Sequence, residues 1–169
     1  RETRSREELE EWFHRLMREY EKWAAFQFEW KKIRKESIRP LEFPFPYREG
    51  QKGLAAGVYR TIARKKRLFI QAPTGVGKTI STVFPAVKAV GEELGDRIFY
   101  LTAKTVTRTV AEEAFRILRG SGLRMKTVTL TAKEKLCVCG ETLCNPENCP
   151  YAGGHFDRIN DAVFELLTK

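Results

Sequence analysis

The stretch QAPTGVGKTI (Gln71–Ile80) places two glycines, a lysine and a threonine between two apolar segments. The run RLFIQA before the loop (Arg67–Ala72) predicts a buried strand, and the segment after it (Lys78–Leu94) predicts a helix. Gly75 and Gly77 let the backbone turn tightly, so that backbone N–H groups point inward at the positive end of a helix. A glycine-rich loop between a strand and a helix is the context that a phosphate-binding loop requires.

The side chains of this loop predict a nucleoside triphosphate with Mg²⁺ as the ligand. Lys78 would reach the β- and γ-phosphates as a point charge, and the hydroxyl of Thr79 would coordinate Mg²⁺. Ala72 stands where such loops often have glycine. A phosphate loop alone does not name a function, because many enzyme classes share it. The predicted phosphate-binding residues are Thr74, Gly75, Val76, Gly77, Lys78 and Thr79.

The chain after the loop alternates between short apolar runs and amphipathic segments. Two further strands are predicted at Arg97–Thr102 and Met125–Ala132, and a second helix at Thr105–Gly120. Strands that alternate with helices form a parallel sheet covered by helices. We therefore expect an α/β fold of the P-loop NTPase (RecA-like) class, a parallel sheet with flanking helices. A long N-terminal helix would precede it, and a cysteine-rich cluster insert would follow.

The N-terminal part predicts a long helix and then a linker. Ser5 and Glu8 form a capping-box pattern, and apolar residues recur at helical spacing to about Ile33. We expect this aromatic stripe to serve packing. Three prolines break the pattern within Arg39–Gln51, and a helix is predicted over about Glu49–Ala63. The expected domains are a helical segment (1–40), a partial ATP-binding motor domain (41–135) and the start of a cluster insert (136–169).

The amino-acid composition and the net charge indicate which classes of partner the chain can bind. The 169 residues carry a net charge of +9, and residues 52–135 hold 17 basic and 6 acidic side chains. Such a surface suits a nucleotide or a nucleic acid, although a solvated basic surface would look the same. No apolar run approaches the ~20 residues of a membrane span, and the first residues are too charged for a secretory signal. We expect a cytoplasmic protein with no membrane partner.

Four cysteines lie in a turn-rich run near the C-terminal end. Cys137, Cys139, Cys144 and Cys149 fall within CVCGETLCNPENC. In a protein of the cytosol, this density predicts a metal site before disulfides. The spacing is compatible with an iron–sulfur cluster, and it also leaves zinc or free thiols open. His155 is a candidate ligand in the zinc case, although a solvated loop histidine is the favoured interpretation.

Four stretches in order, FPYREGQ, APTGVGKT, YLTAKTVTRTVAEEA and the cysteine run, resemble the superfamily 2 DNA helicases of the XPD/DinG type. The resemblance covers about residues 43–162. It implies ATP as the nucleotide, a 4Fe-4S cluster on the four cysteines, and single-stranded or forked DNA as the substrate. It further implies that Arg48 and Gln51 read the adenine. The residues implied to contact DNA are Thr102, Lys104, Thr105 and Arg108.

Two departures limit what this chain does by itself. The family's acidic D-E-x-H motif is absent, since no Asp-Glu dipeptide occurs, and so is a second motor domain. We expect a piece of a longer protein that binds ATP and does not turn it over alone, with the remainder of the helicase as its partner. A cysteine beyond Lys169 would make Cys139 a spare ligand. The alternatives are a P-loop kinase with a zinc lid and a metal-stapled nucleic-acid-binding module.

Overall fold

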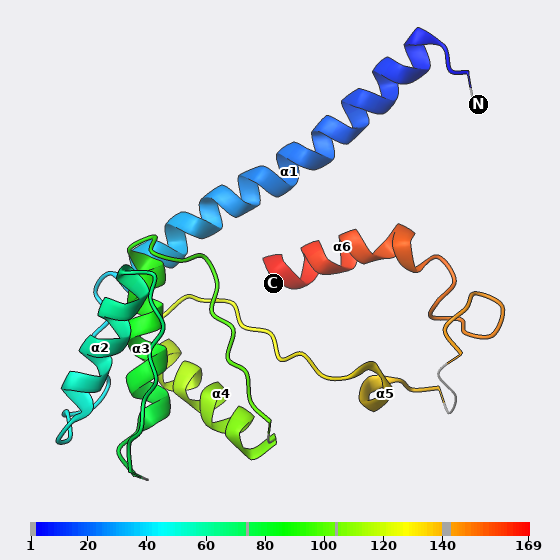
Figure 1. Ribbon diagram of the computed structural model, residues 1–169. Helices are drawn as coiled ribbons and strands as arrows, with labels where there is room; N and C mark the ends of the chain where they lie inside the picture. The colour runs from blue at the N-terminus through cyan, green and yellow to red at the C-terminus, as the bar shows by residue number, and fades with distance from the viewer. Residues whose placement is uncertain (1–2, 74, 104, 140–142) are drawn as a thin grey trace. The chain divides into compact units, whose positions relative to one another are not determined.

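The computed structural model describes residues 3–73, 75–103, 105–139 and 143–169, without the side chains of residues 105 and 106. The chain forms two compact units, Arg1–Lys126 and Thr127–Lys169. The first unit holds helices α1 (Arg6–Ile38), α2 (Gln51–Ala63), α3 (Lys78–Gly91) and α4 (Thr105–Gly120), shown in Figure 1. The second holds α5 (Lys133–Leu136) and α6 (His155–Thr168). No helix in the described ranges is long and apolar enough to cross a membrane.

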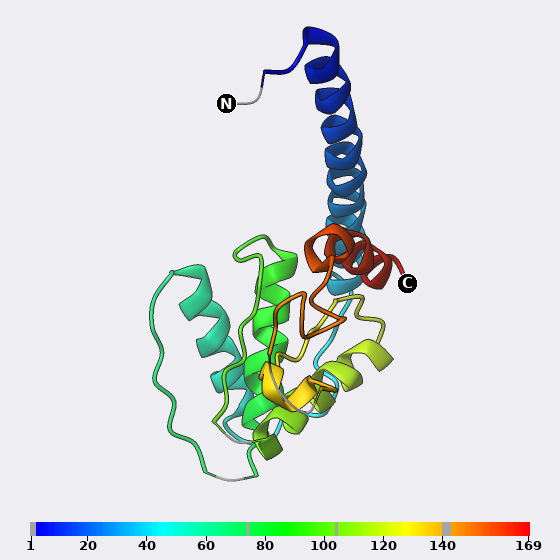
Figure 2. The same ribbon diagram turned by 90° about the vertical axis from the view of Figure 1, so that its right-hand side faces the viewer.

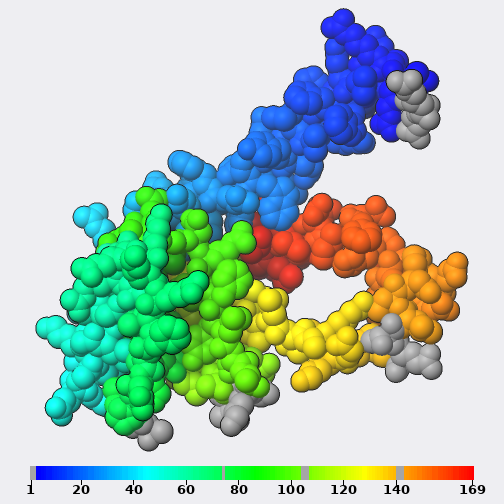
Figure 3. All heavy atoms as spheres, in the orientation of Figure 1, coloured from blue at the N-terminus to red at the C-terminus, as the bar shows by residue number. Residues whose placement is uncertain are grey.

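The predicted capping box begins α1. The backbone N–H of Glu8 donates to Ser5 Oγ at 3.2 Å, and the N–H of Ser5 donates to Glu8 Oε2 at 2.8 Å. This prediction is confirmed. The helix continues to Ile38, beyond the expected end, and its N-terminal half stands clear of the other helices of its unit (Figure 3). The predicted packing of the aromatic stripe is not seen there, because several of its side chains are exposed: Leu9, Trp12, Phe13, Leu16 and Tyr20.

Helix α3 lies at the centre of the first unit and packs against α1, α2 and α4 (Figure 2). Val83 and Val87 are buried on α3, where they meet Ile38 of α1 and Leu118 of α4 in one apolar cluster. Helices α2 and α3 run in the same direction. Their first residues meet where Gln51 Nε2 donates to Val76 O, and their last turns meet where the Tyr59 hydroxyl donates to Glu92.

The predicted parallel sheet is wrong for this structure. The part of the chain described contains no strand, so the three segments expected to pair form no sheet there. Apolar side chains in them face solvent, with Phe69 94%, Leu101 88% and Leu130 85% exposed. A short run of β-branched and aromatic residues indicates an extended backbone, but a sheet also needs neighbouring segments that satisfy its hydrogen bonds. The unit is therefore built from helices, and the RecA-like α/β assignment does not hold.

Glycine and lysine together fix the junction of α1 with α3. A Cβ added at Gly91 would lie 2.4 Å from Ile38 Cγ2, so only glycine permits this approach of the two helices. Lys88 Nζ donates to the carbonyl oxygens of Ile38, Arg39 and Leu41 at 3.0–3.2 Å. A cation at these free carbonyls stabilises the end of a helix. This contact accounts for the extension of α1 beyond its predicted end.

Three helices of the first unit end in the same backbone geometry. An N–H donates to the carbonyl five residues earlier from Lys66 to Thr61, from Leu94 to Ala89 and from Leu123 to Leu118, each at 3.0 Å. This motif places one residue in the left-handed region, where glycine is favoured. The residue is Gly122 after α4, but it is Glu93 after α3 and Lys65 after α2, with φ of 62° and 53°.

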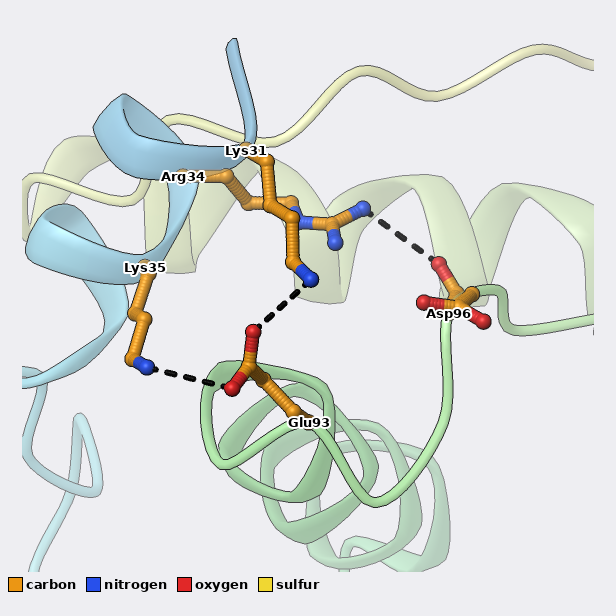
Figure 4. A network of polar contacts seen from close by, with 5 residues as sticks. All are labelled: Lys31, Arg34, Lys35, Glu93 and Asp96. Atoms are coloured by element: carbon orange, nitrogen blue, oxygen red, sulfur yellow. Dashed lines mark hydrogen bonds and ion pairs between the residues drawn. The ribbon is translucent and has the colours of Figure 1, made fainter. Parts of the chain in front are cut away.

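The strained position of Glu93 has a visible reason. Its carboxylate accepts from Lys31 at 2.8 Å and from Lys35 at 3.3 Å, while Arg34 donates to the carbonyl of Asp96 (Figure 4). The hydrogen bonds from Lys31 and Lys35 hold the pKa of Glu93 below its ordinary value, and the same contact raises the pKa of Lys31. The ion pairs thus tie the end of α3 to the last turns of α1.

Candidate nucleotide-binding site

The site is built at the start of α3, where the glycine-rich loop becomes helix. Gly77 caps the helix with φ 72°, and the N–H of Ser81 donates to its carbonyl at 3.1 Å. No side chain of a described residue caps this end. The first backbone N–H groups of a helix have no partner within it, so they are available to an anion, which the helix dipole also favours.

Arg48 and Gln51, which the resemblance implies read the adenine, both contact the loop. Arg48 Nη1 donates to Gly75 O at 2.6 Å, and Gln51 Nε2 donates to Val76 O at 2.8 Å. The backbone N–H of Arg48 donates to Gln51 Oε1 at 2.9 Å, and Gln51 is only 4% exposed. The structure therefore brings both side chains to the loop, where they hold two of its carbonyl oxygens. Recognition of the base by them stays a prediction.

Gly75 and Gly77 are required in the loop for different structural reasons. Gly75 has φ 87°, and a Cβ built on it would meet nothing within 4 Å. A Cβ on Gly77 would lie 2.6 Å from Gln51 Nε2, in addition to the positive φ. Gly75 is thus required by backbone conformation alone, whereas Gly77 is also required by close packing against Gln51.

Lys78, the predicted ligand of the phosphates, is engaged by carbonyl oxygens of the loop itself. Lys78 Nζ donates to Ala72 O at 2.9 Å and to Pro73 O at 2.8 Å. Thr79 follows as the second residue of α3 and is partly buried, and Thr74 lies outside the described residues. A phosphate at the helix start would offer Lys78 a charged acceptor in place of two neutral carbonyls, and charge-assisted hydrogen bonds are the stronger ones.

An aromatic pair that the sequence did not reveal lies next to Arg48. Phe43 and Tyr47 stack with ring centroids 4.2 Å apart, and Phe43 meets Phe84 of α3 edge to face at 5.4 Å. These contacts attach the proline-rich linker to α3, which sets the position of Arg48. The signal in the sequence was the recurrence of aromatic residues in a segment that prolines keep extended.

The predicted nucleic-acid residues begin α4. Arg108 is held by Glu112, one helical turn away, with its Nε 3.6 Å from Glu112 Oε1. That Nε is buried and forms no hydrogen bond. Thr102 lies in the extended segment before the helix and is exposed. Lys104 lies outside the described residues, and Thr105 is described only as the first residue of α4.

The described residues of the cysteine segment, 137–139 and 143–154, lie between α5 and α6 and contain turns from residue 145 on. Cys137 closes α5 by donating its N–H to Lys133 O at 2.9 Å, and Cys149 is 9% exposed. Burial would raise the pKa of the Cys149 thiol, but hydrogen bonds from the N–H groups of Ala152 and Tyr151 lower it. Burial, together with Cys149, raises the pKa of Cys139.

The thiols lie near one another, and Cys139 is within hydrogen-bonding reach of both Cys149 and Cys137. A hydrogen bond to Cys144 raises the pKa of Lys133. Across the described ranges, no three histidine, cysteine, aspartate or glutamate side chains converge to hold a metal ion. The iron–sulfur cluster on these cysteines therefore stays a prediction. His155, the alternative zinc ligand, lies edge to face with Phe156 at the start of α6.

Comparison with known proteins places one stretch of the chain beside a helicase. Over 47 residues the chain is 45% identical to the protein "Probable ATP-dependent helicase MJ0942" of Methanocaldococcus jannaschii. The match covers 27% of this chain and 7% of that protein's length. No family model matches the chain, and no solved structure matches it. One stretch of the chain is therefore similar to a short part of a probable ATP-dependent helicase.

Proposed function

We propose that this chain is the nucleotide-binding part of an ATP-dependent DNA helicase, and that it binds Mg-ATP at the loop preceding α3. The observation that carries the proposal is the contact of Arg48 and Gln51 with the carbonyls of Gly75 and Val76. With these carbonyls held by donors on one side, the N–H groups of the same loop and of the helix start remain for an anion. The similarity to a probable ATP-dependent helicase supports the same reading.

In this proposal Lys78 and Thr79 act on the phosphates. Lys78 exchanges the carbonyls of Ala72 and Pro73 for phosphate oxygens, and the Thr79 hydroxyl holds Mg²⁺. Arg48 is anchored to the loop through Gly75 O, and in this proposal the base binds beside it. Base selectivity comes from Arg48 and from the unused hydrogen-bonding capacity of the Gln51 amide, which has one further N–H and one further lone pair.

Single-stranded DNA is the proposed second ligand. It would contact the segment that leads into α4, where Thr102, Thr105 and Arg108 provide hydroxyls and a cation near a helix start. Arg108 would exchange Glu112 for a phosphate. Stepping along DNA requires the acidic motif and second motor domain that this sequence lacks, so hydrolysis and unwinding belong to the complete helicase.

A competition experiment tests nucleotide recognition. A fluorescent ATP analogue bound to the chain is displaced with ATP, GTP or inorganic tripolyphosphate, each with Mg²⁺. We expect ATP to compete best, and we expect Arg48→Ala to reduce its advantage over tripolyphosphate while Arg39→Ala, at an exposed arginine outside the loop, does not. Equal competition by tripolyphosphate and ATP on the unaltered chain would show an anion site without nucleotide recognition.

A binding titration tests the DNA contact separately. Arg108→Ala should weaken binding of a labelled oligodeoxythymidine and leave ATP binding unchanged. Arg116→Ala is the matched control, because Arg116 is also ion-paired on α4, with Glu113 at 2.6 Å, and lies away from the helix start. Equal DNA affinities for the two variants would contradict the proposed DNA path.

A further inference from the structure

The region around α2 has an unusually one-sided charge. Between Glu49 and Glu92 the sequence contains eight basic residues and no acidic one. Five of the eight lie on the last turn of α2 and directly after it, and all five are exposed. We call them the α2-end basic cluster: Arg60, Arg64, Lys65, Lys66 and Arg67.

The cluster is not neutralised by its own unit. In the described ranges no ion pair joins any of the five to a carboxylate, and the contact seen is Arg60 Nε donating to Ala56 O at 3.2 Å. The carboxylates at the neighbouring end of α3 are already engaged. Glu92 accepts from the Tyr59 hydroxyl, and Glu93 pairs with Lys31 and Lys35. The positive charge therefore faces solvent.

Lys65 has a left-handed backbone conformation, which is unfavourable for lysine. It has φ 53° at the end of α2, where α4 uses Gly122 at the equivalent position. The left-handed region is unfavourable for a residue with a Cβ. At the end of α3 the same disadvantage is offset by the ion pairs of Glu93, but Lys65 has no such partner among the described residues. A ligand outside the chain would provide the missing contact for Lys65.

The cluster is separate from the nucleotide site. Gln51 and the loop lie at the first residue of α2, and the cluster lies at its other end, roughly 20 Å away for a helix of this length. Nothing in the proposed ATP chemistry uses these five side chains.

We propose that the α2-end basic cluster binds the phosphate backbone of a nucleic acid, as a contact additional to the start of α4. Several cations on consecutive residues match a ligand with repeating negative charge better than a single anion. The contact would be made by the side chains of the cluster with phosphates. Phosphate contacts carry no sequence information, so we expect this binding to be independent of base sequence. The choice of a nucleic acid over another polyanion rests on the proposed helicase function. The basic cluster itself is an observation that does not depend on that function.

The test compares two triple variants of the chain in a salt titration. Arg64→Gln, Lys65→Gln and Lys66→Gln are combined in one variant, and the exposed α1 residues Arg15→Gln, Arg18→Gln and Lys32→Gln in the other, so both lose the same charge. Binding of a labelled oligodeoxythymidine of about 20 nucleotides is measured by anisotropy between about 50 and 200 mM salt. The cluster variant should lower the slope of log affinity against log salt by about 2, and the control variant by much less.

The variant Lys65→Gly provides a second test, in which stability and oligonucleotide affinity should change in opposite directions. Glycine takes the left-handed conformation freely, so the unfolding midpoint in urea should rise while the oligonucleotide affinity falls. An affinity unchanged in both the triple variant and Lys65→Gly would overturn the proposal. Equal losses in the cluster and control variants would also overturn it, by showing that only net charge matters.

Two further outcomes distinguish this proposal from a membrane-binding role of the cluster and from the proposed DNA contact at α4. Tighter binding to phosphatidylserine vesicles than to the oligonucleotide, lost in the cluster variant, would assign the cluster to a membrane surface and overturn the nucleic-acid reading. An Arg108→Ala variant that binds DNA normally, beside a cluster variant that does not, would support this proposal and contradict the DNA path at α4. The ATP competition reports on the nucleotide site in either case.

Discussion

At the scale of single residues, the loop depends on two glycines that do different work. Gly75 needs only its positive φ, so Gly75→Ala should lower the free energy of unfolding by about 1 kcal/mol. Gly77→Ala has the same conformational cost, and its Cβ would also lie 2.6 Å from Gln51 Nε2. Because it also displaces a buried hydrogen-bonding side chain, we expect a loss of about 2–3 kcal/mol.

Urea unfolding of the two variants checks this difference. Gly77→Ala should also abolish ATP binding, since moving Gln51 releases the carbonyl of Val76, while Gly75→Ala should retain weakened binding. Equal losses of stability in the two variants would contradict the described packing of Gln51 on the loop.

The residue types of the site were predictable, but their partners were not. The pattern of the loop and the Arg48–Gln51 pair was evident in the sequence. The direction of their hydrogen bonds was not, because it depends on which loop carbonyls face α2 once Phe43 and Tyr47 have attached the linker to α3. The free carbonyls at the end of α1 and their partner Lys88 were likewise hidden, being 47–50 residues apart.

At the scale of helices, the α1–α3 junction depends on the absence of a side chain at Gly91. Gly91→Ala would place a Cβ 2.4 Å from Ile38 Cγ2 and should destabilise the chain by about 1–3 kcal/mol. Gly53→Ala, in the open first turns of α2, is the control and should be neutral or stabilising by up to about 1 kcal/mol. Thermal and urea unfolding measure both, and a Gly91→Ala variant as stable as Gly53→Ala would contradict this helix contact.

The ion pairs of Glu93 predict how the same junction responds to acid. Lys31 and Lys35 hold its pKa below the ordinary 4.5, so the contribution of Glu93 is present above that value and is lost as the pH falls through the lowered pKa. Stability of the unaltered chain should exceed that of Glu93→Gln near neutral pH, and the difference should shrink in acid. A difference that stays constant from about pH 6 to about pH 3 would contradict the ion-paired geometry.

Helices were predicted well and strands were not, for a physical reason. A helix satisfies its own backbone, so a capping box at Ser5 and an amphipathic run before Gly120 are local signals that determine an element. A strand depends on segments elsewhere, and the apolar runs around Phe69, Leu101 and Leu130 gave no information about pairing. The ends of α1 and α3 also differed from expectation, because Lys88 and Glu93 set them through contacts between helices.

At the scale of the whole molecule, the cysteine segment has little packing of its own, since among its described residues (137–139 and 143–154) Cys149 alone is buried. If it closes around an iron–sulfur cluster, chain purified without oxygen should be brown, with iron and sulfide present together. Cys144→Ser or Cys149→Ser should remove the colour, and Cys139→Ser should retain it only if Cys139 is a spare. Colourless chain, with one zinc or with no metal, would contradict the cluster.

The central claim is that the loop before α3 binds Mg-ATP, and calorimetric titration of Mg-ATP into the chain tests it most directly. We predict one site per chain, and an affinity weakened by roughly 1.5–3 kcal/mol in Lys78→Ala, the scale of a charged hydrogen bond. Lys52→Ala, at an exposed lysine of α2, should bind as the unaltered chain does. No heat of binding, or equal affinity for the unaltered chain and Lys78→Ala, would contradict the account.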